Sequence, residues 1–235
     1  MRQLPLSVRL RDRASFESFL AGPNSTALQQ IRSLAEHPRP GLVWLYGPEG
    51  SGKTHLLQSL CAQAGSEAVY LPLSQLESYG ASAISDWQGG RWLCLDDVAW
   101  AAGRSEWERA LFAVYRDCEE RGACLLMAAR EPPSQVGFAL QDLASRCAAG
   151  HRLVLQTLDE EQQIAALRLR AQLRGFELPE ETAHYLQRRL PRDMASLFAL
   201  LDELDAAALA AQRRLTVPFI RDVLARRARG QAGES

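Results

Sequence analysis

The stretch Leu42-Val-Trp-Leu-Tyr46, followed by Gly47-Pro-Glu-Gly-Ser-Gly-Lys53-Thr54, decides the fold of this 235-residue chain. Its first part is a short apolar run, which predicts a buried strand. Its second part matches the pattern G-x-x-x-x-G-K-[ST] at every fixed position, and a helix is predicted from Lys53 to about Ala64. The stretch therefore predicts a phosphate-binding loop between a strand and a helix, with a glycine-rich turn that binds nothing as the alternative.

The residue types of this loop suit the phosphates of a nucleotide. Glycines let backbone N–H groups turn inward around phosphate oxygens, and the positive end of the helix adds to the attraction. Lys53 would reach the β- and γ-phosphates, and the hydroxyl of Thr54 would hold Mg²⁺. Lys53 is also the one lysine among 27 basic residues, and its compact ammonium fits a tight loop better than a guanidinium does. The predicted nucleotide-binding residues of the loop are Gly47, Pro48, Glu49, Gly50, Ser51, Gly52, Lys53, Thr54 and His55.

A second apolar run, Trp92-Leu-Cys-Leu95, ends in the acidic pair Asp96-Asp97. A strand that ends in carboxylates downstream of a phosphate loop is the other half of a nucleoside-triphosphate site. We expect Asp96 to join the Mg²⁺ shell, and Asp97 is a candidate for orienting water.

The remaining apolar runs alternate with helical patterns as far as residue 157. Strands are predicted at residues 68–73, 123–129 and 152–156, and helices at 106–121 and 141–146. This alternation predicts an α/β fold with a parallel sheet wrapped by helices on both faces. From Asp159 onward four helical segments follow without a strand, which predicts a small all-helical domain.

Composition excludes several classes of protein. With 27 basic and 28 acidic residues the formal charge is −1, which argues against a generally basic nucleic-acid binder. Neither a signal peptide nor a membrane span is indicated, so a cytoplasmic location is expected. The five cysteines are scattered, and buried reduced thiols are favoured over disulfides or a zinc site.

Together these motifs resemble the AAA+ ATPases, and most of all the DnaA-related branch. Gly52-Lys-Thr-His-Leu56, the Asp96-Asp97 pair, Arg130-Glu-Pro-Pro133 and Leu169-Arg-Ala-Gln-Leu-Arg-Gly-Phe-Glu-Leu-Pro179 resemble the bacterial initiator DnaA and the shorter Hda family, the regulatory inactivators of DnaA. The resemblance covers nearly the whole chain. It implies an AAA+ nucleotide-binding domain at residues 14–157 and a helical lid domain at residues 158–235. Because the chain stops at Ser235, no helix-turn-helix domain is expected, which favours a regulator over an initiator.

The resemblance also assigns roles outside the phosphate loop. Arg146, in Leu143-Ala-Ser-Arg146, corresponds to an arginine finger presented in trans to the ATP of a neighbour. Arg192 corresponds to the lid arginine that senses the bound nucleotide, and the segment with Phe19 and Leu20 lies near the adenine. For each, an ordinary surface or packing residue is the alternative.

Residues 1–13 resemble a sliding-clamp-binding peptide, through Gln3, Leu4 and Leu6 of Gln3-Leu-Pro-Leu-Ser-Val8. An extended segment of this kind places apolar anchors in a pocket while the Gln amide makes directional hydrogen bonds. A disordered tail is the alternative.

The resemblance implies a negative regulator of DNA replication that binds ADP, or alternatively ATP, with Mg²⁺. It would dock on the DNA-loaded clamp, reach DNA mainly through it, and stimulate hydrolysis of DnaA-bound ATP. A second copy of the chain is a further candidate partner, in a homo-oligomer. Hydrolysis by the chain itself is expected to be slow, because Ala128-Ala129 and Asp97 replace a polar residue and a Glu typical of AAA+ motors. The main rival is a motor or helicase loader that hydrolyses its own ATP. A P-loop kinase and a DNA-binding module with a C-terminal arginine cluster are weaker rivals.

Overall fold

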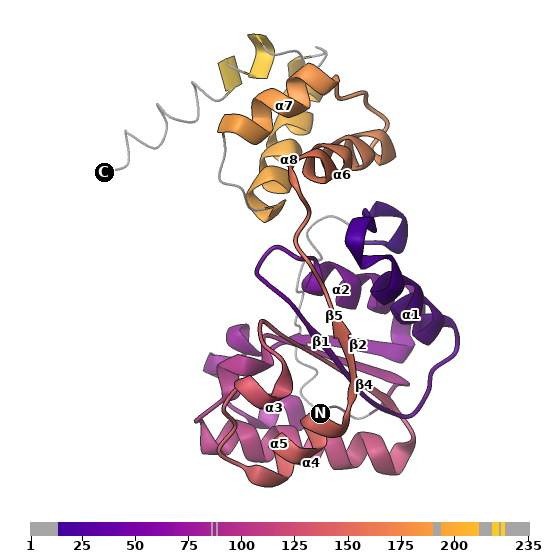
Figure 1. Cartoon of the computed structure of the whole chain (residues 1–235), viewed down its shortest axis with the longest axis vertical. Coiled ribbons are helices and arrows are strands. Elements are labelled where there is room, and N and C mark those ends of the chain that lie inside the picture. The colour runs from indigo at the N-terminus through magenta and orange to yellow at the C-terminus, as the bar shows by residue number, and fades with distance from the viewer. Residues whose placement is uncertain are drawn as a thin grey trace. The chain divides into compact units, whose positions relative to one another are not determined.

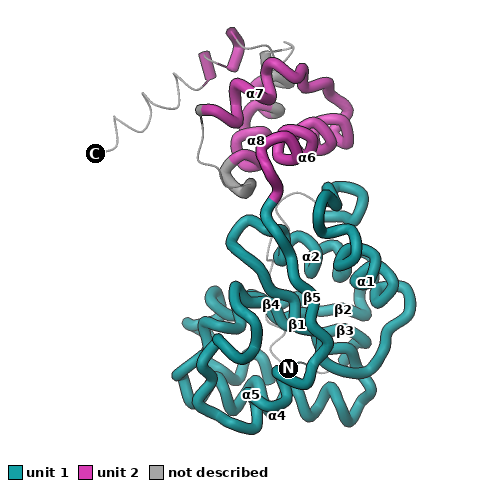
Figure 2. Tube along the Cα trace, in the orientation of Figure 1, with its two compact units in different colours: residues 1–157 teal, residues 158–235 magenta. Residues whose placement is uncertain are grey.

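The computed structural model describes residues 14–85, 87, 89–189, 194–211, 218–220 and 222–223. The chain divides after Thr157 into two compact units, Met1–Thr157 and Leu158–Ser235 (Figure 2). In the described part of the chain, every helix is too short or too polar to cross a membrane. The two units are described one at a time.

The first unit is built on a five-stranded parallel sheet (Figure 1). The strands are β1 (Gly41–Tyr46), β2 (Ala68–Pro72), β3 (Trp92–Asp96), β4 (Cys124–Ala129) and β5 (His151–Val154). Their order across the sheet is β2-β3-β4-β1-β5, and each neighbouring pair is parallel. Strands β3 and β4 are buried along their whole length, as expected for strands covered on both faces. The predicted parallel α/β fold is confirmed.

Each face of the sheet carries its own hydrophobic core, because successive side chains of a strand point to opposite faces. Leu45 of β1 packs with leucines of the helix that follows the phosphate loop, whereas its neighbour Trp44 belongs to the core on the opposite face. The helices that supply the first core are α1 (Ser25–Glu36) and α2 (Lys53–Ala64), and those that supply the second are α3 (Ser82–Ser85), α4 (Ser105–Arg121) and α5 (Gln141–Ala149).

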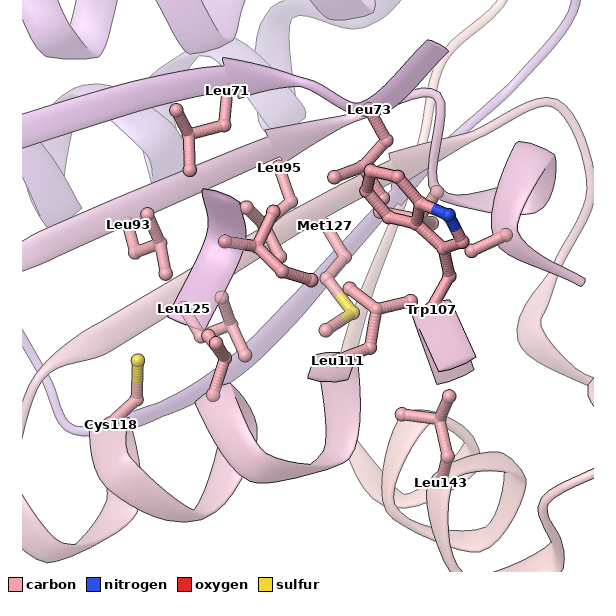
Figure 3. Close-up of a cluster of buried hydrophobic side chains, with 14 of the residues drawn as sticks. Leu71, Leu73, Leu93, Leu95, Trp107, Leu111, Cys118, Leu125, Met127 and Leu143 are labelled. Atoms are coloured by element: carbon pink, nitrogen blue, oxygen red, sulfur yellow. The ribbon is translucent and has the colours of Figure 1, made fainter. Parts of the chain in front are cut away.

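Helix α4 lies against the centre of the sheet on the second face (Figure 3). Leu111 of α4 is fully buried beside Leu95 and Met127 of the strands above it. Each leucine buried in this way stabilises the fold by roughly 1.5–3 kcal/mol. This packing fixes α4 on the sheet, and α5 joins the same core through Leu143 and Cys147.

Just after β5, a side chain takes the place of a neighbouring strand in pairing with the backbone. Asn24, which is 2% exposed, donates from Nδ2 to the carbonyl of Gln156 (2.9 Å) and accepts from the N–H of Gln156 on Oδ1 (2.8 Å). The amide of Asn24 therefore satisfies both backbone groups of Gln156, one residue before Thr157.

The second unit is helical, as predicted. It contains α6 (Glu160–Leu173), α7 (Glu180–Arg189) and α8 (Met194–Ala211). Helix α6 begins with a capping box, in which Asp159 Oδ1 accepts from the N–H of Gln162 (2.8 Å) and Gln162 Oε1 accepts from the N–H of Asp159 (3.1 Å).

Two helices of the first unit, α1 and the four-residue α3, were not predicted from the sequence. Helix α1 buries Ala27, Ile31 and Ala35, and the half-buried Leu28 and Leu34 pack on the same core. These five residues recur at helical spacing, so an amphipathic pattern was present in the sequence and was missed. The predicted strand at residues 68–73 also ends one residue earlier, since Leu73 begins a 3₁₀ turn.

Candidate functional site

The predicted phosphate loop leaves the carboxyl end of β1 and runs into α2. Two of its glycines have conformations or surroundings that a side chain would not tolerate. A Cβ on Gly47 would collide with the backbone carbonyl of Leu155, and one on Gly52 (φ +98°) would lie 2.6 Å from Cε2 of Phe19. The loop therefore depends on glycine at both positions, because Leu155 and Phe19 of other segments approach it closely.

Lys53 lies inside this loop. Its Nζ donates to the carbonyl oxygens of Gly47 (2.7 Å) and Pro48 (2.8 Å), and the side chain is buried. Burial lowers the pKa of Lys53, an effect that the negative charge of Asp96 opposes. The ammonium group is thus held at the centre of the curved backbone, where an anion would bind.

The carboxylate of Asp96 is buried at the end of β3 and is hydrogen-bonded on both oxygens. Its Oδ2 accepts from the hydroxyls of Thr54 (2.6 Å) and Tyr70 (2.9 Å), and its Oδ1 accepts from the N–H of Asp97 (3.0 Å). Burial raises the pKa of Asp96, while the hydroxyl donors act in the opposite direction. The structure thus joins the predicted Mg²⁺ residues Thr54 and Asp96 directly.

Asp97 lies in different surroundings from Asp96. It is exposed, and its Oδ2 accepts from the hydroxyl of Ser74 (3.1 Å). Its φ of 56° is the one positive value found for a non-glycine residue in the described part of the chain. A left-handed backbone at such a residue costs free energy and is frequent at functional sites. The two acids therefore differ in burial and in hydrogen-bonding partners.

The residues present fit the phosphates of a nucleotide. Ser51 Oγ is buried in the loop and has no hydrogen-bond partner within the described structure, which makes it a donor available to an oxygen. At the exposed tip of the loop, Glu49 pairs with Arg130 of the loop after β4 (2.7 Å). No three His, Cys, Asp or Glu side chains form a metal-binding group within the described residues. A magnesium ion would therefore need phosphate oxygens or water in addition to Thr54 and Asp96.

The segment before α1 packs on the start of α2. The rings of Phe19 and His55 meet edge to face with centroids 5.4 Å apart, and His55 Nε2 lies 3.1 Å from Ser18 Oγ and 3.0 Å from the Ser15 carbonyl. Leu20 is half-buried. Phe19 therefore lies beside both His55 and Gly52 of the phosphate loop.

Arg146 lies on the second turn of α5. Its neighbours Leu143 and Cys147 are buried, whereas Arg146 itself is exposed. Its guanidinium carbon lies 5.8 Å from the centre of the Tyr115 ring of α4. No carboxylate pairs with Arg146 among the residues that the structure describes. The guanidinium is therefore accessible to solvent and to another molecule.

Some predicted site residues lie outside the described residues. They are Arg192, assigned to the lid, and Gln3, Leu4 and Leu6, assigned to the clamp-binding peptide. The arginine cluster near the C-terminus falls outside them as well.

Two residues with polar contacts inside the first unit, one at the Asp96 edge and one on α4, were missed by sequence reasoning. Tyr70 of β2 reaches Asp96 because β2 and β3 are neighbours, and only the order of the strands could have indicated this. Glu108 is buried on the apolar face of α4, three residues before Leu111. An acidic residue at that spacing was a signal that it contacts a polar partner inside the fold.

Two family models match the chain, one in each unit. Residues 10–78 match the model of the bacterial DnaA ATPase domain. Residues 159–224 match the model of the Hda lid domain. The two matches together cover the phosphate loop and nearly all of the second unit.

Solved AAA+ proteins share this fold. The chain is similar to domain III of the Thermotoga maritima replication initiation protein DnaA, with a TM-score of 0.75 and 22% identity over 89% of this chain and 94% of that chain. AMPPCP-bound DnaA from Aquifex aeolicus gives a TM-score of 0.67 and 20% identity over 83% of this chain and 66% of that chain. The RuvB branch migration motor of Thermotoga maritima gives a TM-score of 0.61 and 15% identity over 88% of this chain and 72% of that chain. At these identities the likeness shows the fold.

Proposed function

Because the chain is an Hda-like, DnaA-related AAA+ protein, we propose that it is a negative regulator of replication initiation that acts on DnaA. It holds a nucleotide, docks on the DNA-loaded sliding clamp and stimulates hydrolysis of the ATP bound to DnaA. Its own residues contribute in three places, which are the phosphate loop, Arg146 and the N-terminal peptide.

The phosphate loop and the Asp96 edge hold the nucleotide, which we propose is ADP. Lys53 and the backbone N–H groups at the start of α2 bind phosphate oxygens. Thr54 and Asp96, joined by a 2.6 Å hydrogen bond, hold Mg²⁺, which neutralises phosphate charge when bound. That relatives such as AMPPCP-bound DnaA take a nucleotide supports this assignment. The resident nucleotide then stabilises the regulator without being its substrate.

One observation carries the action in trans: Arg146 is exposed on α5, in a chain whose second unit matches the Hda lid. A guanidinium with no carboxylate partner in the described structure is available to a phosphate of another molecule. Placed against the γ-phosphate of ATP on DnaA, it stabilises the negative charge that develops during hydrolysis. The N-terminal peptide Gln3–Val8 brings the protein to the clamp, and through the clamp to DNA.

The test mixes ATP-loaded DnaA, clamp on DNA and this protein, and follows the conversion of ATP to ADP. Arg146→Ala is expected to lower the stimulated rate of hydrolysis by about 10³-fold or more, because an arginine finger contributes on that scale. Arg121→Ala, another exposed arginine in the first unit, serves as the matched control. If Arg146→Ala stimulates as well as the parent, the action in trans is wrong.

A second arm tests clamp docking. The double variant Gln3→Ala with Leu4→Ala is expected to abolish binding to the clamp, measured with immobilised clamp, while nucleotide affinity stays the same. Unchanged clamp binding would remove this part of the proposal without touching the role of Arg146.

The rival function, hydrolysis of its own ATP, is favoured by the intact set of Lys53, Thr54 and Asp96. It predicts appreciable turnover in the absence of DnaA. Against it, β4 ends in Ala128 and Ala129 where a motor needs a polar side chain to position water. We expect slow intrinsic turnover, which a measurement on the isolated protein decides.

A further inference from the structure

Glu108 of α4 is a buried carboxylate that the nucleotide site does not use. The residue is 1% exposed. Its Oε1 accepts from the backbone N–H groups of Gly103 (2.7 Å) and Ala139 (3.1 Å), and its Oε2 accepts from that of Leu140 (2.7 Å). One side chain thus joins α4 to the loop before it and to the loop that leads into α5.

This carboxylate does for α5 what the N3 side chain does in a capping box, because it accepts from the N–H of the N-cap residue, Leu140. The N-cap of α5 is Leu140, whose side chain has no oxygen to accept a hydrogen bond from the helix. Glu108 places an anion at this end instead, where the helix dipole is positive. Since burying an unsatisfied carboxylate is costly, all three N–H groups are needed to hold it there.

We propose that Glu108 is a positioning residue for Arg146: it fixes the start of α5 and thereby the place of the guanidinium. The inference rests on the proposed function, because it concerns the same arginine. Arg146 lies six residues beyond Leu140, about 9 Å along the helix at 1.5 Å per residue. Leu143 and Cys147 pack α5 on the core. Because the hydrogen-bonded backbone of a helix moves as one body, a tilt or slide at Leu140 also moves Arg146.

The first test replaces the carboxylate by an amide. Glu108→Gln leaves a single acceptor oxygen, so either Leu140 or the Gly103 and Ala139 pair loses its acceptor and faces an NH₂ group. The maximal rate of stimulated ATP hydrolysis on DnaA is expected to fall about tenfold to hundredfold, the scale of a 1 Å misplacement. The protein concentration that gives half of this maximum is expected to change less. Hydrogen exchange should become faster at the N–H groups that lose their acceptor, either Leu140 or Gly103 and Ala139, and the protein's own nucleotide affinity should stay the same.

The second test removes a donor and leaves Glu108 in place. Leu140→Pro deletes one N–H group, and the φ of −77° at Leu140 suits proline. A similar fall in the maximal rate is expected. The double variant should lose less than the two single losses combined, because both act on one hydrogen-bonded group. If Glu108→Gln does not fold, Leu140→Pro decides the question.

Glu106→Gln makes the same chemical change on the same helix at an exposed position and should leave the rate unchanged. The inference is overturned if Glu108→Gln or Leu140→Pro speeds exchange at the α5 entrance while the maximal stimulated rate is retained. It is overturned too if either variant lowers nucleotide affinity as much as the rate, since that indicates a general loss of structure. Failure of Arg146→Ala to lower the rate would instead overturn the proposed function.

Discussion

The phosphate loop and helix α5 belong to the same unit, yet their charged groups are satisfied in opposite ways. Lys53 and Asp96 are buried and have hydrogen-bonding partners within the chain. Arg146 is exposed, lies against Tyr115 and pairs with no carboxylate among the described residues. Under the proposed function, the site for the protein's own nucleotide is organised in advance by its own backbone. The group proposed to act on another molecule is instead accessible on a helix that packs on the core.

The largest loss of nucleotide affinity is expected for a substitution of Lys53 in the phosphate loop. Lys53→Ala removes a buried ammonium and should weaken nucleotide binding by about hundredfold or more, since hydrogen bonds to a charged group contribute about 1.5–3 kcal/mol each. Titration with a fluorescent nucleotide measures this. Arg146→Ala should leave the same affinity unchanged. If both variants weaken binding equally, the two regions are not separate.

A smaller effect is expected at the contact between the loop and the N-terminal segment. Gly52→Ala places a methyl group 2.6 Å from the Phe19 ring and should weaken nucleotide binding about tenfold, because crowding of this kind costs about 1–3 kcal/mol. Gly50→Ala is the matched control, because φ there is also positive but the space is open. Phe19→Ala in the Gly52→Ala background should restore part of the loss. Equal losses at Gly50 and Gly52 would assign the effect to backbone conformation alone.

Tyr70→Phe tests how the hydroxyl of Tyr70 stabilises the buried carboxylate of Asp96, through the free energy of unfolding. The pKa of Asp96 is raised in the folded state, so the folded state binds more protons and stability falls as pH rises from about 3.9 through that raised pKa. Loss of the Tyr70 hydroxyl removes a donor to the ionised carboxylate. The variant should therefore be less stable than the parent by about 1–3 kcal/mol at pH 7, and by less at acid pH. Urea unfolding at several pH values measures this, and a difference independent of pH would contradict it.

The smallest effect is expected for the control arginine of α4. Arg121 pairs with Asp117 at 2.8 Å; Arg121 is exposed and Asp117 is half-buried. Arg121→Ala should change stability by less than about 1 kcal/mol and should not alter stimulation of hydrolysis on DnaA. A large loss of stimulation would mean that general positive charge, and not the place of Arg146, is what matters.

The parallel sheet and the helical second unit could be predicted from the sequence, because their signals are local. The apolar runs of β1, β3 and β4 bracket a complete phosphate-loop pattern, and strand-helix alternation leaves few topologies open. Helix α1 was missed although Ala27, Leu28, Ile31, Leu34 and Ala35 recur at helical spacing, so its signal was local as well.

The contacts that complete the site depend on which elements lie side by side. The phosphate-loop residues come from one segment and were therefore visible. Tyr70 meets Asp96 only because β2 pairs with β3, and Glu108 meets Leu140 across 32 residues. No local pattern encodes such pairs, although the burial pattern of α4 marks Glu108 as unusual.

The amide of Asn24 has a mechanical consequence. By holding both backbone groups of Gln156, it makes that residue the last fixed point of the first unit. Asparagine suits this place because its amide both donates and accepts, whereas an aspartate would keep the acceptor and lose the donor. The backbone of the first unit is thus held at its last residue but one by a side chain more than 130 residues away in sequence.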